Sequence, residues 1–268
     1  MTGVPSSGFS RQLWSALRRW CREQVGAKGA AGATSLLVRN LWSFVRESTP
    51  QRRRQRYGDM EYDWENRVNT TSGTVGWRAR LLGMFHSPYQ ATDPALFREM
   101  MASLPIEFDP FTFVDLGSGK GRTLLMASEY PFRRIVGVEV IAELHRAAEE
   151  NIRMYHSATE QCTQIEAVCA DACEFVLPDT PLVLYLFNPL PEAGLQRVLR
   201  NLERSLEQSP RWVWIVYHNP AMDSVLGTSR ALARVGGTEQ YSVFRSDPGF
   251  KLSESQGCKD PSRRIHQP

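Results

Sequence analysis

One short segment constrains the fold of this chain more than any other, because it places three glycines and an acid where two secondary-structure elements meet. It reads VDLGSGKGR and covers residues 114–122. Residues 111–116 are largely apolar and β-prone, and residues 123–130 are compatible with a helix. A strand, a glycine-rich loop and a helix in this order are typical of a loop that binds a nucleotide cofactor, since the glycines let the backbone approach the ligand.

The spacing of the glycines differs from two common phosphate-binding loops. A P-loop requires a glycine five positions before Gly119 and a Ser or Thr after Lys120, but Val114 and Gly121 occupy these positions. A dinucleotide-binding fingerprint requires G-x-G-x-x-G, whereas the spacing here is G-x-G-x-G. The carboxylate of Asp115 would also repel a pyrophosphate. The loop therefore indicates a ligand with positive charge.

Further apolar runs continue the pattern of a parallel sheet. Residues 134–139 end in Glu139, close to the interval of roughly 20 residues at which a ribose-binding acid follows a glycine loop, so we predict Glu139 as a ribose ligand. Residues 165–172 are expected to form a third strand and its exit. Residues 182–191 contain a fourth strand, and its continuous apolar run is typical of a strand buried on both faces.

These segments resemble the class I S-adenosylmethionine-dependent methyltransferases over about residues 108–246. In that family the first strand ends in D/E-x-G-x-G-x-G, an acid closes the second strand, and an Asp follows the third. Residues 89–94 also resemble a Tyr-x-x-Thr-x-Pro element of the protein-lysine methyltransferase-like subgroup. The resemblance implies S-adenosyl-L-methionine as the cofactor. The predicted cofactor-binding residues are Thr92, Asp115, Gly117, Ser118, Gly119, Gly121, Glu139, Asp171 and Ala172.

The expected fold is α/β, a Rossmann-like, doubly wound and mostly parallel seven-stranded sheet with a C-terminal antiparallel hairpin and an N-terminal helical extension. Residues 212–217 are the predicted fifth strand. Residues 231–235 and 241–244 form the hairpin, and Gly236 and Gly237 are expected to separate its strands. Helices are predicted at residues 94–104, 123–130, 141–156 and 192–208.

Charge divides the chain into a basic arm and an acidic body. Residues 1–56 hold eleven Lys and Arg against two Glu, a net charge of +9, and the remaining residues have a net charge of −6. Two stretches of the arm have apolar residues at helical spacing, and glycine and alanine at residues 26–35 indicate a hinge between two helices. The predicted divisions are a basic helical arm at 1–60, a methyltransferase domain at 61–246 and a flexible tail at 247–268.

The basic arm has several interpretations. Its helices either pack on the domain or form a solvated extension. Alternatively they lie on anionic lipid, serve as a mitochondrial transit peptide, or contact nucleic acid phosphates through the arginines at residues 52–56. No apolar run approaches the ~18 to 20 residues of a spanning helix. We expect a cytoplasmic protein, with a mitochondrial or peripheral membrane location as alternatives, and expect cofactor binding to survive the loss of residues 1–34.

The cysteines do not indicate a metal site. Five cysteines are present, and Cys162, Cys169 and Cys173 have neither C-x-x-C spacing nor nearby pairs of histidines. Neither zinc nor a disulfide framework is predicted. We expect reduced, buried thiols.

The predicted reaction depends mainly on positioning. A sulfonium methyl group is already activated, so the enzyme has to align a nucleophile and exclude water. We place this work at Asn188 and Pro189, after the fourth strand, where an amide oxygen and a backbone carbonyl can accept hydrogen bonds from a substrate nitrogen. The alternative is an Asn that only satisfies a turn.

The expected acceptor is a protein lysine or another amine. The rival functions are a cofactor-binding adaptor without activity, recruited by the basic arm, and an NAD-dependent oxidoreductase. His218 follows the fifth strand at the same edge of the sheet and is a further candidate for substrate contact. Lys120 and Arg122 are expected to face solvent or to cap nearby carboxylates.

Overall fold

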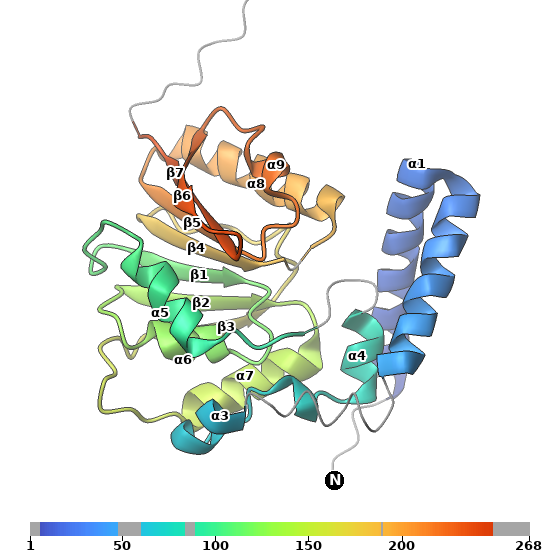
Figure 1. The fold of residues 1–268 in the computed structure, drawn as a ribbon, viewed down its shortest axis with the longest axis horizontal. Coiled ribbons are helices and arrows are strands. Elements are labelled where there is room, and N and C mark those ends of the chain that lie inside the picture. The colour runs from blue at the N-terminus through green and yellow to red at the C-terminus, as the bar shows by residue number, and fades with distance from the viewer. Residues whose placement is uncertain (1–5, 48–59, 84–88, 189, 249–268) are drawn as a thin grey trace, which may run out of the picture.

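A single mixed sheet forms the centre of the molecule (Figure 1). The computed structural model describes residues 6–47, 60–83, 89–188 and 190–248. The sheet has seven strands in the order β3-β2-β1-β4-β5-β7-β6. The strands are β1 (Thr112–Leu116), β2 (Arg134–Glu139), β3 (Ile165–Cys169), β4 (Leu182–Phe187), β5 (Val213–His218), β6 (Leu232–Gly237) and β7 (Tyr241–Ser246).

The pairing of the strands confirms the predicted α/β fold. β1 lies between β2 and β4, and β3 and β5 extend the sheet on either side, all in parallel. β7 runs antiparallel to both β5 and β6. The carboxyl ends of five parallel strands therefore meet at one edge of the sheet, which is where ligands bind in open α/β folds.

The closing hairpin differs from the prediction at its turn. Gly236 and Gly237 belong to β6, where they pair with β7, and the turn occupies residues 238–240. Gly237 has a φ of 123°, and a Cβ at this position would lie 2.3 Å from the backbone oxygen of Tyr241. The glycine is therefore needed for a close approach of two backbones rather than for the turn.

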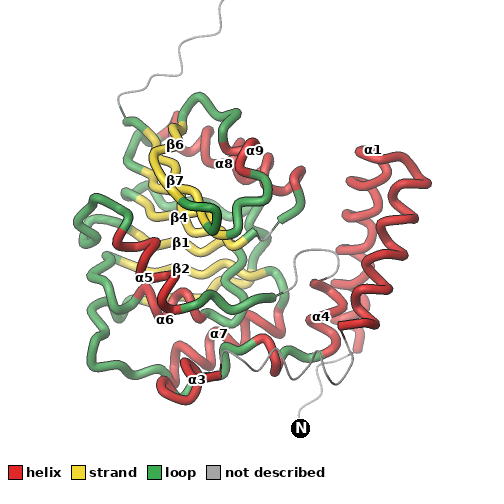
Figure 2. Tube along the Cα trace, in the orientation of Figure 1, coloured by secondary structure: helices red, strands yellow, loops and turns green. Residues whose placement is uncertain are grey.

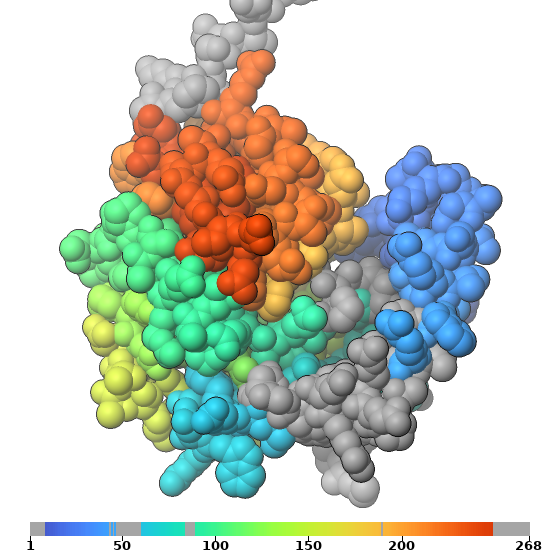
Figure 3. Space-filling view, in the orientation of Figure 1, coloured from blue at the N-terminus to red at the C-terminus, as the bar shows by residue number. Residues whose placement is uncertain are grey.

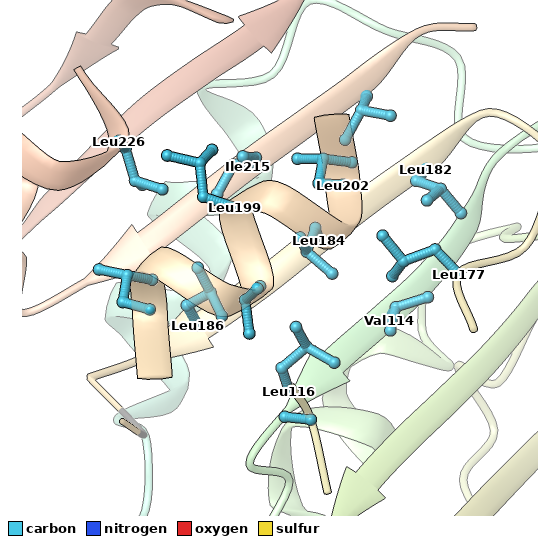
Figure 4. Close-up of a cluster of buried hydrophobic side chains, with 14 of the residues drawn as sticks. Val114, Leu116, Leu177, Leu182, Leu184, Leu186, Leu199, Leu202, Ile215 and Leu226 are labelled. Carbon is cyan, nitrogen blue, oxygen red and sulfur yellow. The ribbon is translucent and has the colours of Figure 1, made fainter. Parts of the chain in front are cut away.

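Helices cover both faces of the sheet (Figures 1 and 2). α8 (Glu192–Gln208) has the predicted bounds, and its leucines pack on one face; Figure 4 shows Leu199 and Leu202 beside Leu184 of β4 and Ile215 of β5. The apolar spacing of three and four residues explains why this helix forms. The same face carries α9 (Asp223–Leu226). The other face carries α5 (Pro94–Ala102), α6 (Arg122–Ala127) and α7 (Ala142–Met154).

The burial of the cysteines depends on their place in the sheet. Cys162 and Cys173 are buried, as expected, but Cys169 is exposed. Cys169 ends β3, which is an edge strand and has no buried position along its length. The expectation of buried thiols is therefore wrong at this position.

The N-terminal arm is a helical hairpin. α1 (Ser6–Glu47) is interrupted at Gly29, where φ is 69° and ψ is 172°. The two limbs on either side of Gly29 lie next to each other (Figures 1 and 2). This confirms the predicted hinge and narrows it to one residue, because only glycine adopts these dihedral angles readily.

Both limbs of α1 contact the short helix α4 (Trp77–Gly83). The ring of Phe9, on the first limb, lies 5.7 Å from that of Trp77, and the guanidinium of Arg80 lies 5.2 Å from the ring of Phe44, on the second limb. The arm therefore packs on the rest of the chain, as the first of its interpretations expects. Two further short elements precede the sheet, α3 (Met60–Asn66) and the 3₁₀ helix η1 (Ser72–Thr74).

Some expectations concern segments outside the described residues. They include the arginines at residues 52–56 and most of the predicted tail. Among the helices that are described, none is long and apolar enough to cross a membrane.

Candidate functional site

A cavity of about 240 Å³ lies at the carboxyl edge of the parallel strands. Residues from the ends of β1, β2, β3 and β4 line it, together with part of α1. Gly119 and Gly121 do not line it, and Pro189 lies outside the described residues. The predicted residues that do line the cavity are Thr92, Asp115, Gly117, Ser118, Glu139, Asp171, Ala172 and Asn188.

Gly119 and Gly121 belong to the glycine loop next to the cavity but do not line it. Gly119 has a φ of 55°, and a Cβ there would lie 2.2 Å from the ring carbon Cε2 of Tyr89. Gly121 has a φ of 83° at the start of α6, and a Cβ there would lie 3.2 Å from the Cβ of Ala148. Both glycines are therefore required by the backbone conformation, and Gly119 also by the overlying Tyr89 ring.

Glu139 is held by two backbone amides. Its Oε2 accepts a hydrogen bond from the N–H of Gly119 at 2.9 Å, and its Oε1 accepts one from the N–H of Ile141 at 2.7 Å. Burial raises the pKa of this carboxyl, and the backbone hydrogen bonds oppose the shift. The carboxylate is thus fixed between the glycine loop and the start of α7.

Asp115 has a buried oxygen atom that no described residue satisfies. The residue is 2% exposed, and its Oδ2 accepts a hydrogen bond from the hydroxyl of Thr123. Its Oδ1 is buried and finds no hydrogen-bond partner among the described residues, and neither does the hydroxyl of Ser118. Burial, with a smaller effect of the Glu139 charge, raises the pKa of Asp115 to about 7. An unsatisfied buried carboxylate oxygen in a cavity indicates a place for a ligand donor.

Asp171 has a partner that sequence reasoning missed. Its Oδ2 pairs with the guanidinium of Arg19, from the first limb of α1, and its Oδ1 accepts a hydrogen bond from the N–H of Cys173 at 3.0 Å. Burial alone would raise the pKa of Asp171, but this backbone N–H and Arg19 outweigh it and lower the pKa. No local signal could reveal the contact, because the partners are 152 residues apart.

The first limb of α1 forms one wall of the cavity. Its contributing residues are Ala16, Arg19, Trp20 and Glu23, which share one helix face. Ala16 and Trp20 are buried. In the space-filling view α1 is a lobe beside the sheet domain (Figure 3). The first limb therefore supplies part of the lining, and the expectation that cofactor binding survives the loss of residues 1–34 stays a prediction.

Asn188 lines the cavity and directly follows β4. Its φ is 42°, which is uncommon for a residue other than glycine but tolerated by Asn. The hydroxyl of Tyr217 donates a hydrogen bond to its Oδ1 at 3.0 Å. The amide that we predicted to position the substrate therefore has a fixed orientation.

His218 lies behind the cavity wall. It is the last residue of β5, and its Nδ1 is 2.8 Å from the hydroxyl of Tyr185, which in turn is 2.9 Å from the hydroxyl of Thr92. Its ring stacks on that of Phe187 at 3.8 Å. Burial lowers the pKa of His218 to about 4, so the ring is neutral at pH 7. His218 does not line the cavity, but the two residues that it contacts, Tyr185 and Phe187, do.

Lys120 and Arg122 are buried, so the first expected alternative, that they face solvent, is wrong, and the second, that they cap a nearby carboxylate, is confirmed for Arg122. Arg122 is 2% exposed, and it pairs with Asp63 at 3.2 Å and donates to the hydroxyl of Thr70 at 2.6 Å. Lys120 is 3% exposed and donates to the backbone oxygen of Thr71 at 3.0 Å. These contacts tie the glycine loop to the segment around α3 and η1. Sequence reasoning gave that segment no role, because it shows no clear periodicity.

No family model and no curated protein matches the chain. Similar solved structures include an RNA methyltransferase from Salinibacter ruber in complex with S-adenosyl-L-homocysteine (19% identity, TM-score 0.43, 61% of this chain and 97% of that one). A second is human N-acetylserotonin methyltransferase in complex with SAM (14% identity, TM-score 0.40, 56% of this chain and 50% of that one). A third is a predicted N6-adenine-specific DNA methylase from Listeria monocytogenes (12% identity, TM-score 0.43, 58% of this chain and 51% of that one). The matched region spans about half the length of these last two chains.

Proposed function

We propose that this chain is an S-adenosylmethionine-dependent methyltransferase that acts on the nitrogen of a protein lysine or of another amine. The observation that carries the proposal is the convergence of three carboxylates, Asp115, Glu139 and Asp171, from consecutive strand ends in one cavity. The Oδ1 of Asp115 is buried there without a protein donor. A cationic ligand supplies the charge and the donor that this group lacks.

S-adenosylmethionine fits this set of residues. It carries a sulfonium and an ammonium group, which suit the carboxylate of Asp115. Its ribose hydroxyls suit Glu139, whose oxygens keep further lone pairs beyond the two backbone donors. Asp171 and Ala172 would contact the base, and the hydroxyls of Ser118 and Thr92 are further polar groups of the lining. When bound, the cofactor supplies a methyl group activated by the positive sulfur.

The same residues make an NAD-dependent oxidoreductase a poor alternative. A pyrophosphate would meet the buried carboxylates of Asp115 and Glu139. The N–H of Gly119, which would have to face a phosphate, already donates to Glu139. Both features favour a cation over a dianion in this cavity.

Asn188 is the residue that we propose to orient the acceptor. Tyr217 holds its amide, and the second lone pair of Oδ1 remains able to accept a hydrogen bond from a substrate nitrogen. The attacking nitrogen must be unprotonated, and a free lysine has a pKa of about 10.4. Neutral His218 adds no positive charge to this end of the cavity.

Transfer of an isotopically labelled methyl group tests the proposal. The cofactor would be incubated with the chain and a lysate lacking it, and the label would be followed into protein, nucleic acid and small molecules. Incorporation into an amine supports the proposal. Binding of S-adenosylmethionine without any transfer would favour the adaptor instead, and binding of NAD alone would favour the oxidoreductase.

Substitution of Asn188 tests its role separately. Asn188→Ala should lower the transfer rate about a hundredfold, equivalent to about 2.7 kcal/mol, and leave cofactor affinity within a few fold. Asn201→Ala is the matched control. Asn201 lies on α8 and does not line the cavity, and its side-chain amide donates a hydrogen bond to the backbone oxygen of Phe175 at 2.7 Å. An unchanged rate in Asn188→Ala would make Asn188 a turn residue.

A further inference from the structure

A second, wider groove of about 860 Å³ lies beside the cavity. The first limb of α1 forms most of it, and α8 contributes Arg197. Arg19 and Arg197 line both the groove and the cavity, so the two adjoin at these side chains. Its lining includes one acid, Glu174, and five arginines, Arg11, Arg18, Arg19, Arg22 and Arg197.

We propose that this groove binds a single-stranded nucleic acid and that the strand carries the methyl acceptor. The inference rests on the proposed methyltransferase function and selects one class among its amine acceptors. Phosphates would bind the arginines of α1, and a base would stack on Trp14 (the blue helices in Figures 1 and 3).

The arrangement of the arginines suits phosphates. Arg11, Arg18 and Arg22 are exposed and lie along one helix face, at offsets of seven and four residues. Arg18 and Arg22 are one turn apart, about 6 Å along the helix axis. A guanidinium binds two phosphate oxygens at once and stays charged at every physiological pH. Counterions released from a polyanion add to the affinity.

Two carboxylates pair with arginines of the groove, Asp171 with Arg19 and Glu174 with Arg197, and the five arginines still leave it with a net positive charge. Glu174 pairs with Arg197 at 3.1 Å, and the two side chains are 71% and 35% exposed. An exposed pair of this kind contributes little to stability. A phosphate can therefore take the place of the Glu174 carboxylate on Arg197, which lies where the groove joins the cavity.

Trp14 distinguishes a nucleic acid from other polyanions. Its side chain is 61% exposed and lines the groove among the arginines. An exposed aromatic ring within a basic groove is typical of sites that stack the bases of a single strand. An acidic peptide offers the indole no ring partner, and a bilayer presents a surface that does not follow a groove.

The lining of the cavity also favours a nucleobase amine. The described residues that line it include no histidine or lysine, and three of its four carboxylates, Asp115, Glu139 and Asp171, are assigned to the cofactor. The exocyclic amino group of a base is already neutral at pH 7. Its nitrogen lone pair would form the new C–N bond as the S–CH₃ bond breaks, sulfur would keep the electron pair, and the nitrogen would release one proton to water.

Fluorescence anisotropy with the full-length chain tests the binding. The probes are labelled RNA and DNA single strands of mixed sequence, about 16 nucleotides long, in about 50 and 200 mM salt. Arg18→Gln with Arg22→Gln should weaken binding at least about tenfold and reduce the salt slope by about 1.4, at about 0.7 per phosphate contact. Trp14→Ala should weaken binding about fivefold or more.

Matched controls separate a groove from general charge. Arg133→Gln with Arg153→Gln removes two exposed arginines that lie outside the groove, so binding should change less than about twofold. Vesicles of phosphatidylcholine and phosphatidylglycerol are a second probe, because Val38, Leu41 and Trp42 are exposed on the second limb of α1. Poly-glutamate is the third. Tighter binding of vesicles or poly-glutamate than of the oligonucleotides would overturn the proposal, as would equal effects of the groove and control variants.

Two further readouts keep this inference distinct from the proposed function. Calorimetry with S-adenosylhomocysteine should give the same affinity for the groove variants as for the unaltered chain. Absence of that binding in the unaltered chain would defeat the methyltransferase proposal, while oligonucleotide binding would still be measurable. Labelled methyl groups should appear in the nucleic acid fraction of the lysate. Label found only on protein lysines would overturn the choice of acceptor.

Discussion

Two arginine–aspartate pairs border the same cavity and differ in their surroundings. Arg122 and Asp63, behind the glycine loop, are 2% and 6% exposed, and Asp63 also accepts hydrogen bonds from the backbone N–H groups of Thr70 and Thr71. Arg19 and Asp171, on the α1 side, are 39% and 15% exposed. Solvent weakens the second pair far more than the first. The cavity therefore has a rigid wall at the sheet edge and a more weakly held wall at α1.

This difference suits the two proposed ligands. A small cofactor gains affinity from groups that are already fixed, such as the carboxylate of Glu139 between two amides. A polymeric acceptor has to enter and leave, and a more weakly held wall at α1 would allow this movement. The following predictions test whether the two walls differ as strongly as their burial indicates.

The largest expected effect is on the buried pair. Asp63→Ala should lower the free energy of unfolding by about 3–5 kcal/mol, because it leaves the Arg122 charge buried and removes the acceptor of two backbone amides. Urea denaturation measures the loss. Glu166→Ala is the control, since it breaks an ion pair with Arg134 that is about half exposed and should cost less than about 1 kcal/mol. Equal losses in the two variants would contradict the picture of a rigid wall.

The next effect concerns the glycine loop. Gly119→Val should weaken binding of S-adenosylhomocysteine about a hundredfold or more, because the new side chain would collide with Tyr89 at a φ of 55°. Calorimetry gives the affinity, and circular dichroism should show a folded chain. Gly26→Ala serves as the control, because a Cβ at Gly26 meets nothing within 4 Å. Normal binding by Gly119→Val would mean that the loop has room which the structure does not show.

The pH dependence of binding should follow Asp115. Its pKa is raised to about 7, so the apo chain is stabilised by the protonated group at low pH and loses that stabilisation as the pH rises from about 4 to about 7. A cation needs the ionised form, so S-adenosylmethionine should bind about tenfold more weakly at pH 6 than at pH 8. Asp115→Asn should bind weakly at both. A remaining pH dependence in that variant would point to Glu139, whose pKa burial also raises.

The smallest effect is expected at the α1 wall. Arg19→Ala should change the free energy of unfolding by less than about 1 kcal/mol, and the pKa of Asp171 should rise towards its usual value. Thermal unfolding and an NMR titration of the carboxyl measure the two quantities. A loss as large as that of Asp63→Ala would show that the two walls are held equally firmly.

Local patterns in the sequence predict the residues of the sheet-edge wall, but not the buried ion pair between Arg122 and Asp63 behind it. The glycine loop, the acids at Asp115 and Glu139, and the bounds of α8 all follow from spacing along the chain, and the structure brings them to the expected edge. The burial of Arg122 could not be predicted, because its partner Asp63 lies 59 residues earlier. The sequence around a charged residue in a glycine loop does not show whether its side chain is exposed or is paired with a distant residue.

For the wall formed by α1, the sequence predicts the helices and the hinge but not their contacts with the domain. Helical spacing and the small residues at 26–35 indicate two helices and a hinge, and both are present. The contact between Arg19 and Asp171 is a property of the tertiary arrangement, since each residue alone is compatible with exposure to solvent. For the same reason the sequence shows a basic arm, and the fold shows that four of its arginines line a groove.

The conformation of Gly29 decides how far this molecule extends. An unbroken helix over the 42 residues of α1 would be about 63 Å long at about 1.5 Å per residue. The reversal at Gly29 instead places Phe44 and Phe9 against the same short helix. Any residue with a Cβ is strained in that conformation. A residue with a Cβ at position 29 would therefore disfavour the reversal that brings both limbs of α1 to α4.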